Sequence, residues 1–176
     1  MATYQEISAG EMDSFMDSEG FVKVSHDALQ GFEEQYDLSC EDIAGNGLKI
    51  RLFSTIDIRS NSGRGNGSDA MRLVIMTSEG ILRGAKLKRV HRVVNWRKNL
   101  MARYNEILNL IETGAISFCS SFDCPKCGEK VRTLLNGAYS HKTFMGCSGY
   151  RKNDCRYTCD VRTGWDIALG QMEAAR

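Results

Sequence analysis

The sequence has no long apolar run and contains only one proline. No apolar stretch approaches about 18 residues, so we expect no transmembrane helix and no membrane partner. The first twenty residues are acidic and polar, without the basic start and apolar core of a signal peptide. We therefore expect a cytoplasmic, intracellular protein. In that compartment seven cysteines favour metal binding over a disulfide framework.

Signatures of catalysis are also scarce. The three histidines lie far apart, so no Ser/His/Asp or Cys/His arrangement is indicated. Asp57, Asp69 and Glu79 could serve a metal-dependent nuclease. However, Ile81 stands where an E-x-K motif would need lysine. We predict that the protein is not an enzyme, and a nuclease is kept as an alternative.

Charge is unevenly distributed although the net charge is +1. Residues 1–48 hold eleven acids and one lysine, whereas residues 49–104 hold thirteen Lys/Arg and three acids. Residues 105–176 are nearly balanced, with nine basic and eight acidic side chains. The basic middle favours a polyanionic partner. The alternative is that the acidic segment packs against the basic part.

Hydrophobic periodicity predicts the body of the protein. Alternation of apolar and polar residues predicts strands at 48–60, 70–78 and 81–94. A helix is expected to begin after Asn95 and to end before Gly114. The middle is therefore read as β-β-β-α, with an antiparallel sheet and one helix covering a face.

The predicted class is α+β, with a C-terminal zinc ribbon after the β-β-β-α domain. A short helix is expected at 8–18, where Ser8 could cap the chain three residues before Glu11. The predicted domains are listed here in order: an α+β domain with an acidic lobe at 1–115, a ribbon at 119–160 and a short C-terminal tail at 161–176.

The ribbon is indicated by cysteine spacing. Cys124 and Cys127 form a C-x2-C pair, and Cys147 and Cys155 follow as C-x7-C. Two thiolates three residues apart can bind one ion, and a structural Zn²⁺ site is closed by four such ligands. The spacing therefore predicts a structural zinc ion, with Cys155 as one candidate for its fourth ligand.

Other residues could compete as ligands. Cys159 could replace Cys155 by spacing alone, and Cys119 could bind only with a different loop. His141 is a further nitrogen candidate, although four cysteines already satisfy zinc. Cys40 is remote and is expected to be a buried thiol.

The segment 124–158 resembles the C-terminal four-cysteine zinc ribbon of type IA DNA topoisomerases. The matching residues are Cys124, Pro125, Cys127, Gly128, Phe144, Gly146, Cys147, Ser148, Tyr150, Cys155 and Thr158. The resemblance implies Cys155 as the fourth ligand, and it implies nucleic-acid binding with a preference for single strands. The gap between Cys147 and Cys155 is longer than the family usually has. The topoisomerase's catalytic part is missing, so strand cleavage is not carried over.

Cations and aromatics supply candidate nucleic-acid contacts, because aromatic rings stack on bases while cations track phosphates. Phe144 is instead expected in the ribbon's small core. Three of the strand candidates share a parity, and two others lie at a helix N-terminus, where a phosphate would offset their charge. The candidates are Arg64, Lys86, Lys88, Arg92, Arg97, Lys98, Tyr150, Arg151, Lys152, Arg156 and Tyr157.

The stretches "STIDIRS", "GRGNGSDAMR" and "VHRVVNWRKNL" also resemble small, mostly uncharacterised bacteriophage proteins. Together these observations predict a nucleic-acid-binding accessory protein for single-stranded or junction DNA. It would act in phage or mobile-element recombination, repair or replication, with a host or phage protein of those processes as a candidate partner. The alternative is a protein-interaction module or inhibitor that acts on a host nucleic-acid machine.

Overall fold

The computed structural model describes residues 7–25, 34–54, 70–82, 88–91, 94–136 and 141–176. The chain divides into two compact units. Unit 1 comprises Met1–Cys40, Gly47–Met76 and Lys86–Leu108. Unit 2 comprises Glu41–Asn46, Thr77–Ala85 and Asn109–Arg176. Two short segments from the first half of the chain therefore belong to the same unit as the six cysteines between residues 119 and 159.

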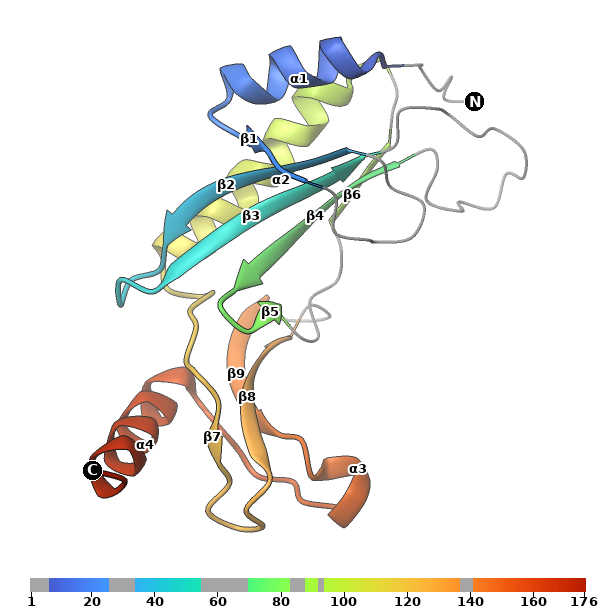
Figure 1. Ribbon diagram of the computed structural model, residues 1–176. Helices are drawn as coiled ribbons and strands as arrows, with labels where there is room; N and C mark the ends of the chain where they lie inside the picture. Colours follow the sequence, from blue (N-terminus) through green and yellow to red (C-terminus); the bar gives the residue numbers. More distant parts are fainter. Residues whose placement is uncertain (1–6, 26–33, 55–69, 83–87, 92–93, 137–140) are drawn as a thin grey trace. The chain divides into compact units, whose positions relative to one another are not determined.

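The larger sheet has the order β1-β2-β3-β4-β5, and β6 also pairs with β4 (Figure 1). Its strands are β1 (Val22–Lys23), β2 (Glu34–Glu41), β3 (Gly47–Ser54), β4 (Ala70–Thr77), β5 (Gly80–Ile81) and β6 (Lys88–His91). β3 and β4 are antiparallel, with Ile50 opposite Ile75. The α+β class with an antiparallel sheet is confirmed. β2 was not expected from the sequence, and the described residues of the predicted strand 81–94 include the end of β5 and the whole of β6.

Helices α1 (Ala9–Ser18) and α2 (Trp96–Glu112) lie beside this sheet (Figure 1). α1 begins where the sequence predicts, because the Ser8 hydroxyl accepts a hydrogen bond from the Glu11 N–H at 3.2 Å. The rings of Phe15 and Trp96 meet edge to face, with centroids 5.1 Å apart. Trp96 is fully buried, so this contact with Phe15 packs α1 against α2 in the apolar interior.

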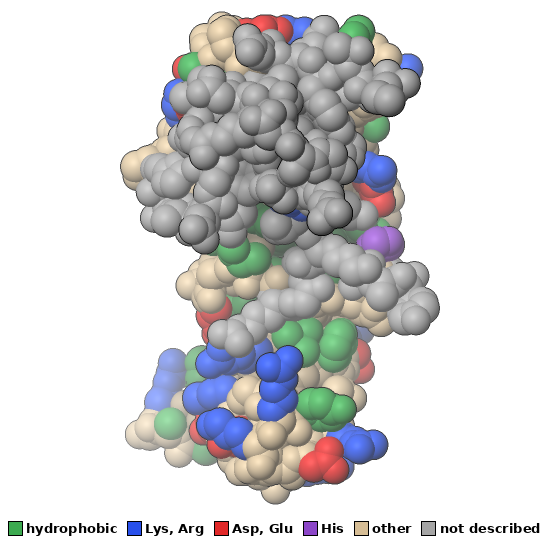
Figure 2. Space-filling view, turned by 90° about the vertical axis from the view of Figure 1, so that its right-hand side faces the viewer, with side chains coloured by type: hydrophobic (Ala, Val, Ile, Leu, Met, Phe, Trp, Pro, Cys, Tyr) green, Lys and Arg blue, Asp and Glu red, His purple; other side chains and the backbone are tan. Residues whose placement is uncertain are grey.

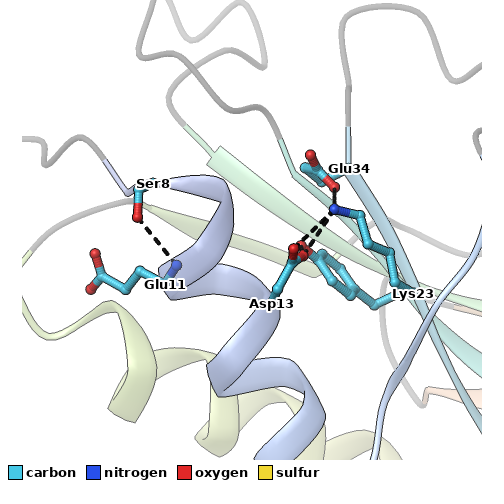
Figure 3. A network of polar contacts seen from close by, with 6 residues as sticks. Ser8, Glu11, Asp13, Lys23 and Glu34 are labelled. Atoms are coloured by element: carbon cyan, nitrogen blue, oxygen red, sulfur yellow. Dashed lines mark hydrogen bonds and ion pairs between the residues drawn. The ribbon is translucent and has the colours of Figure 1, made fainter.

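Acidic residues of the N-terminal segment pair with cations of unit 1. Figure 3 shows Lys23 between two carboxylates, with its Nζ 2.9 Å from Asp13 and 2.7 Å from Glu34. The Tyr36 hydroxyl donates to Asp13 at 2.7 Å, and this bond, with Lys23, lowers the pKa of the Asp13 carboxyl. Part of the acidic segment is therefore neutralised within its own unit.

A second pair is buried in the same sheet. Arg51 donates to both carboxylate oxygens of Asp37, at 2.6 and 2.8 Å. Both residues are buried, although strand alternation alone would place Arg51 on the polar side. The bidentate geometry satisfies both charges away from water.

Unit 2 contains a smaller antiparallel sheet with the order β10-β9-β8-β7. Its elements are β7 (Phe122–Asp123), β8 (Lys130–Asn136), β9 (Lys142–Cys147), α3 (Tyr150–Asn153), β10 (Thr158–Cys159) and α4 (Val161–Ala174). α4 packs on one face of the sheet, where a Cβ on Gly164 would lie 2.8 Å from the Met145 side chain. The core of the unit therefore lies between α4 and this face, around Phe122 and Val131.

The turn between β2 and β3 belongs to unit 2 and is held there by hydrogen bonds. The Asp42 carboxylate accepts hydrogen bonds from the backbone N–H groups of Asn46 and Phe118, at 2.9 and 2.8 Å. The Asn46 amide donates to the Phe118 carbonyl at 2.8 Å. These bonds hold the exposed side chain of Ile43 beside Gly114.

In the described part of the chain, no helix has the length and hydropathy needed to cross a membrane.

Candidate metal centre and ribbon face

Four cysteine sulfurs of unit 2 converge on one point. The Sγ atoms of Cys124, Cys127, Cys147 and Cys155 all lie within 4.8 Å of one another. Cys127 Sγ is 3.5 Å from Cys147 Sγ, and Cys124 Sγ is 3.8 Å from Cys155 Sγ. A tetrahedron with Zn–S bonds of about 2.3 Å places its sulfurs about 3.8 Å apart. The cluster is therefore a site that fits a structural metal ion, in agreement with the predicted ribbon.

The first cysteine pair lies in a tight turn. The Cys124 N–H donates to the Glu129 carbonyl at 2.7 Å, and the Gly128 N–H donates to the Cys124 carbonyl at 2.9 Å. Gly128 has a φ of +75°, a left-handed conformation that favours glycine. This turn brings the two thiols of a C-x2-C pair to the same side of the backbone.

The backbone of Gly149 lies close to the sulfurs of Cys127 and Cys147. A Cβ on Gly149 would lie 3.1 Å from Cys127 Sγ and 3.4 Å from Cys147 Sγ. The Gly149 N–H donates to the Cys147 sulfur at 3.3 Å. Burial raises the pKa of the Cys147 thiol to about 12, so binding of a metal must displace its proton. Metal binding at this site therefore weakens as pH falls.

Two other cysteines of this part of the chain, Cys119 and Cys159, lie outside the four-sulfur cluster. Cys155 is one of the four clustered residues, as the resemblance implied, whereas Cys159 is not. Cys159 lies in β10, where it pairs in register with Met145. Cys119 is buried, and its N–H donates to the Thr133 hydroxyl at 3.0 Å. Among the described residues, this four-cysteine group is the cluster whose geometry could hold a metal ion.

The face of the small sheet opposite α4 carries a different set of side chains. Val131, Thr133 and Met145 alternate toward the core, so residues between them point away from α4. A Cβ on Gly146 would lie 2.6 Å from Leu134 and 3.4 Å from the Phe144 ring, so both side chains lie over this glycine. We call the surface formed by Arg132, Leu134, Phe144 and Thr158 the outer ribbon face.

α3 adds exposed side chains beside this face. Figure 1 draws α3 and α4 on opposite sides of β8 and β9. Tyr150 is 58% exposed, and Arg151 and Lys152 are exposed. Figure 2 turns this side to the viewer, and its lower part shows Lys and Arg side chains beside hydrophobic ones. Cations and hydrophobic side chains, the Tyr150 ring on α3 among the latter, are therefore exposed in unit 2.

Two further predicted contacts have different surroundings. Arg156 is exposed and lies 3.3 Å from the Asp154 carboxylate. Tyr157 is half-buried and packs against the core cluster that contains Met145. Phe144, which the sequence placed in the core, lies on the outer ribbon face instead. The position of the Phe144 side chain follows from the pairing of Phe144 with Leu134 across the two strands. The spacing of the cysteines carries no information about it.

Predicted contacts in unit 1 are only partly described. Arg97 forms an ion pair with Glu11, and its guanidinium lies 4.6 Å from the Trp96 ring centroid. A phosphate would have to displace that carboxylate. Lys98 is exposed on the first turn of α2, and Lys88 lies in β6. Three other candidates fall outside the described residues; they are Arg64, Lys86 and Arg92. Asp57 and Asp69 of the nuclease alternative also lie outside them.

Comparisons with known proteins supply no relative from which a function could be transferred. No family model matches the chain, and no curated protein and no solved structure matches it. The function must therefore be inferred from the metal centre and from the surfaces that surround it.

Proposed function

We propose that this protein binds single-stranded DNA through the outer ribbon face, next to a structural zinc site of the type IA topoisomerase kind. The composition of that face carries the proposal. It combines an aromatic ring, Phe144, with the guanidinium of Arg132, for which the described residues contain no ion pair. A face that joins a half-buried aromatic ring to a positive charge suits bases and phosphates at once.

Stacking would supply the part of the affinity that depends on exposed bases. Phe144 is half-buried beside Leu134 and Gly146, so part of its ring is accessible to a base. Tyr150 adds a second accessible ring on α3. Each base–aromatic stack contributes roughly 1–3 kcal/mol. Because bases of a duplex are stacked on each other, the rings favour single strands.

Cations would supply the part that depends on phosphates. Arg132 and Arg151 are available, whereas Lys152 lies 3.4 Å from Glu129 and Arg156 is paired with Asp154. Exposed ion pairs of this kind contribute only about 0–1 kcal/mol. A phosphate can therefore replace either carboxylate at small cost, and the binding is expected to weaken with salt.

The zinc ion is given a structural role in this proposal. Its four candidate ligands lie at the ends of β7 and β9 and next to α3, so the metal would hold α3 against the sheet. Four cysteine ligands leave no open position for a substrate. When bound, the ion supplies a rigid cross-link between these elements.

Fluorescence anisotropy of a labelled twelve-nucleotide dT strand tests the proposal against a duplex of equal length. We expect micromolar or tighter binding to the strand and weaker binding to the duplex, with affinity for the strand falling as salt rises. Arg132→Glu should weaken binding about tenfold, while Arg103→Glu, a matched charge reversal on α2, should not. Failure to bind either DNA, together with capture of a stable protein partner, would sink the proposal.

The biological setting follows from the sequence resemblances. Single-strand binding by a small protein that resembles phage proteins suits recombination, repair or replication in a phage or mobile element. A second function, binding of a protein partner, is favoured by an apolar groove along α4 that shares no residue with the outer ribbon face.

A further inference from the structure

A small polar cavity of unit 2 is lined by β8 and by the turn between β4 and β5. Its volume is about 290 Å³, just below the range of about 300–1,000 Å³ that is typical of sites for drug-sized molecules. Five of its eight lining residues are polar, and all eight belong to unit 2. We call it the Glu79 pocket, after the carboxylate in its lining. Its size matches a ligand smaller than a drug, such as a single planar ring system.

Hydrogen bonds fix the turn that carries Glu79. The Thr77 hydroxyl accepts a hydrogen bond from the Glu79 N–H at 3.1 Å and donates one to the Gly80 carbonyl at 3.0 Å. One carboxylate oxygen of Glu79, Oε1, accepts a hydrogen bond from the Ser121 N–H at 2.7 Å. The pocket is therefore formed before a ligand binds, and little conformational entropy is lost on binding.

Polar groups of the pocket remain available to a ligand. Within the described part of the chain, the second carboxylate oxygen of Glu79 and the Ser121 hydroxyl have no hydrogen-bond partner. Among the same residues, Arg132 lines this pocket but forms no ion pair with Glu79. A carboxylate accepts hydrogen bonds and has none to donate, so a ligand that binds Glu79 must supply N–H or O–H groups.

Apolar side chains complete the lining. Leu82 and Phe118 are buried, and Ile81 is 39% exposed. Apolar side chains of this kind contact the faces of a planar ring, while a few polar groups bind its edge and fix its orientation. The lining therefore suits a heterocyclic base.

Arg132 belongs both to this pocket and to the outer ribbon face. A strand whose phosphate lies on Arg132 therefore brings one nucleotide to the mouth of the pocket. The same guanidinium offsets the repulsion between the Glu79 carboxylate and the phosphates of the strand. Because the base of that nucleotide is unpaired in a single strand, its pairing edge is free to enter.

We propose that the Glu79 pocket binds a guanine base of the single strand, an assignment that rests on the proposed function. Guanine presents two adjacent donor groups, N1–H and the N2 amino group, and these would face the Glu79 carboxylate. Its O6 would accept a hydrogen bond from the Ser121 hydroxyl. Adenine, cytosine and thymine each offer a single donor group at that edge, so they would leave part of the carboxylate unsatisfied. The outer ribbon face would bind strands of any sequence, and the pocket would add a preference for guanine.

Fluorescence anisotropy of the full-length, zinc-loaded protein with twelve-nucleotide strands tests the proposal. A dT strand with one central guanine should bind roughly five- to tenfold more tightly than the all-dT strand. One central adenine or cytosine should change the affinity by less than about twofold. Replacing the guanine by hypoxanthine removes the N2 amino group, so most of the gain in affinity should be lost.

Glu79→Gln is the most informative variant, because its amide oxygen can still accept from the Ser121 N–H and keep the turn in place. Its amide NH2 group would oppose the donors of guanine, whereas a glutamine side chain pairs well with adenine. The preference for guanine should fall to within about twofold, and the strand with one adenine should become the tighter one by about threefold. Glu173→Gln, the same loss of charge on α4 and outside the pocket, should keep the preference for guanine.

The outcomes separate this proposal from the one it rests on. Equal affinity for the guanine and all-dT strands would overturn the pocket assignment and leave single-strand binding by the outer ribbon face intact. An unchanged preference for guanine in a folded Glu79→Gln protein would also overturn it. Micromolar binding of dGMP without a guanine preference in the strand would assign the pocket to a free nucleotide instead. Absence of binding to any strand would contradict the proposed function itself, and the pocket assignment with it.

Discussion

The two sides of the small sheet share the same strands and differ in what they present. The outer ribbon face carries Arg132 and Phe144, on the side of the strands opposite the core that α4 covers. On the α4 side, the sheet is covered, and the exposed surface is the apolar groove along α4. Because successive side chains of a strand point to opposite faces, the two faces of this one sheet carry different kinds of side chain. We infer that one side is suited to a polyanion and the other to a protein.

Removing the metal is expected to have the largest effect, because both sides depend on one small core. Structural zinc sites contribute on the order of 10 kcal/mol to folding. Cys147→Ser should therefore abolish stoichiometric zinc, lower the melting temperature of unit 2 and eliminate single-strand binding. Metal analysis and thermal unfolding measure the first two effects.

Cys159→Ser is the matched control for that experiment. Cys159 pairs with Met145 in the same sheet but lies outside the four-sulfur cluster. This variant should retain one zinc ion per chain and bind DNA normally. Loss of zinc in Cys159→Ser to the same extent as in Cys147→Ser would contradict the ligand set.

Charge reversal on each side should show which side holds DNA. Arg132→Glu should weaken dT binding about tenfold and reduce its salt dependence by about 0.7 in slope, the contribution of one phosphate on a single strand. Arg162→Glu, on α4, should leave dT binding within a factor of two. Anisotropy of the dT strand with both variants gives the comparison. If both variants weakened dT binding equally, the two sides would not be distinct.

Truncation of Tyr150 should have a smaller effect on the outer side. Tyr150 is 58% exposed and lies on α3, beyond the edge of the sheet. Tyr150→Ala is expected to weaken dT binding by about 1 kcal/mol, the low end of a stacking contact. Tyr150→Phe should retain the affinity, since stacking does not need the hydroxyl. Equal losses in the two variants would assign the effect to a hydrogen bond.

A change in unit 1 should affect neither side of the ribbon. Asp13→Asn removes a carboxylate that Tyr36 and Lys23 contact, and it should destabilise unit 1 by about 1 kcal/mol at pH 7. Because the folded-state pKa of Asp13 is lowered, this contribution is complete above the unfolded value, near 3.8, and is lost as pH falls through the lower folded value. The difference in melting temperature between the two proteins should therefore be largest at pH 7 and should shrink as the pH falls below 3.8 toward the folded-state pKa. A difference that does not shrink in acid would indicate another cause.

The parts of the structure that follow from local rules could be predicted from the sequence. Ser8 caps α1, Gly114 follows α2 with a φ of +75°, and the spacing of Cys124 and Cys127 indicated a metal turn. Each of these features depends on a few neighbouring residues. The fourth ligand, Cys155, required a resemblance, because spacing alone also allowed Cys159.

Features that depend on long-range pairing could not be predicted. β2 has a mixed sequence, and its strand forms because Asp37 and Tyr36 find Arg51 and Asp13 as partners. The outward position of Phe144 depends on its register opposite Leu134. The groove requires Ile43, which is 122 positions before Trp165, and no local pattern joins the two.

The most direct test of the single-strand site is the affinity of Phe144→Ala for a twelve-nucleotide dT strand. Phe144 is half-buried on the outer ribbon face and outside the core beneath α4, so the variant should retain its zinc and its fold. We predict that dT binding weakens by roughly 1–3 kcal/mol while binding to duplex DNA changes little. Unchanged dT affinity in a zinc-loaded, folded Phe144→Ala protein would contradict the assignment of the outer ribbon face to single-stranded DNA.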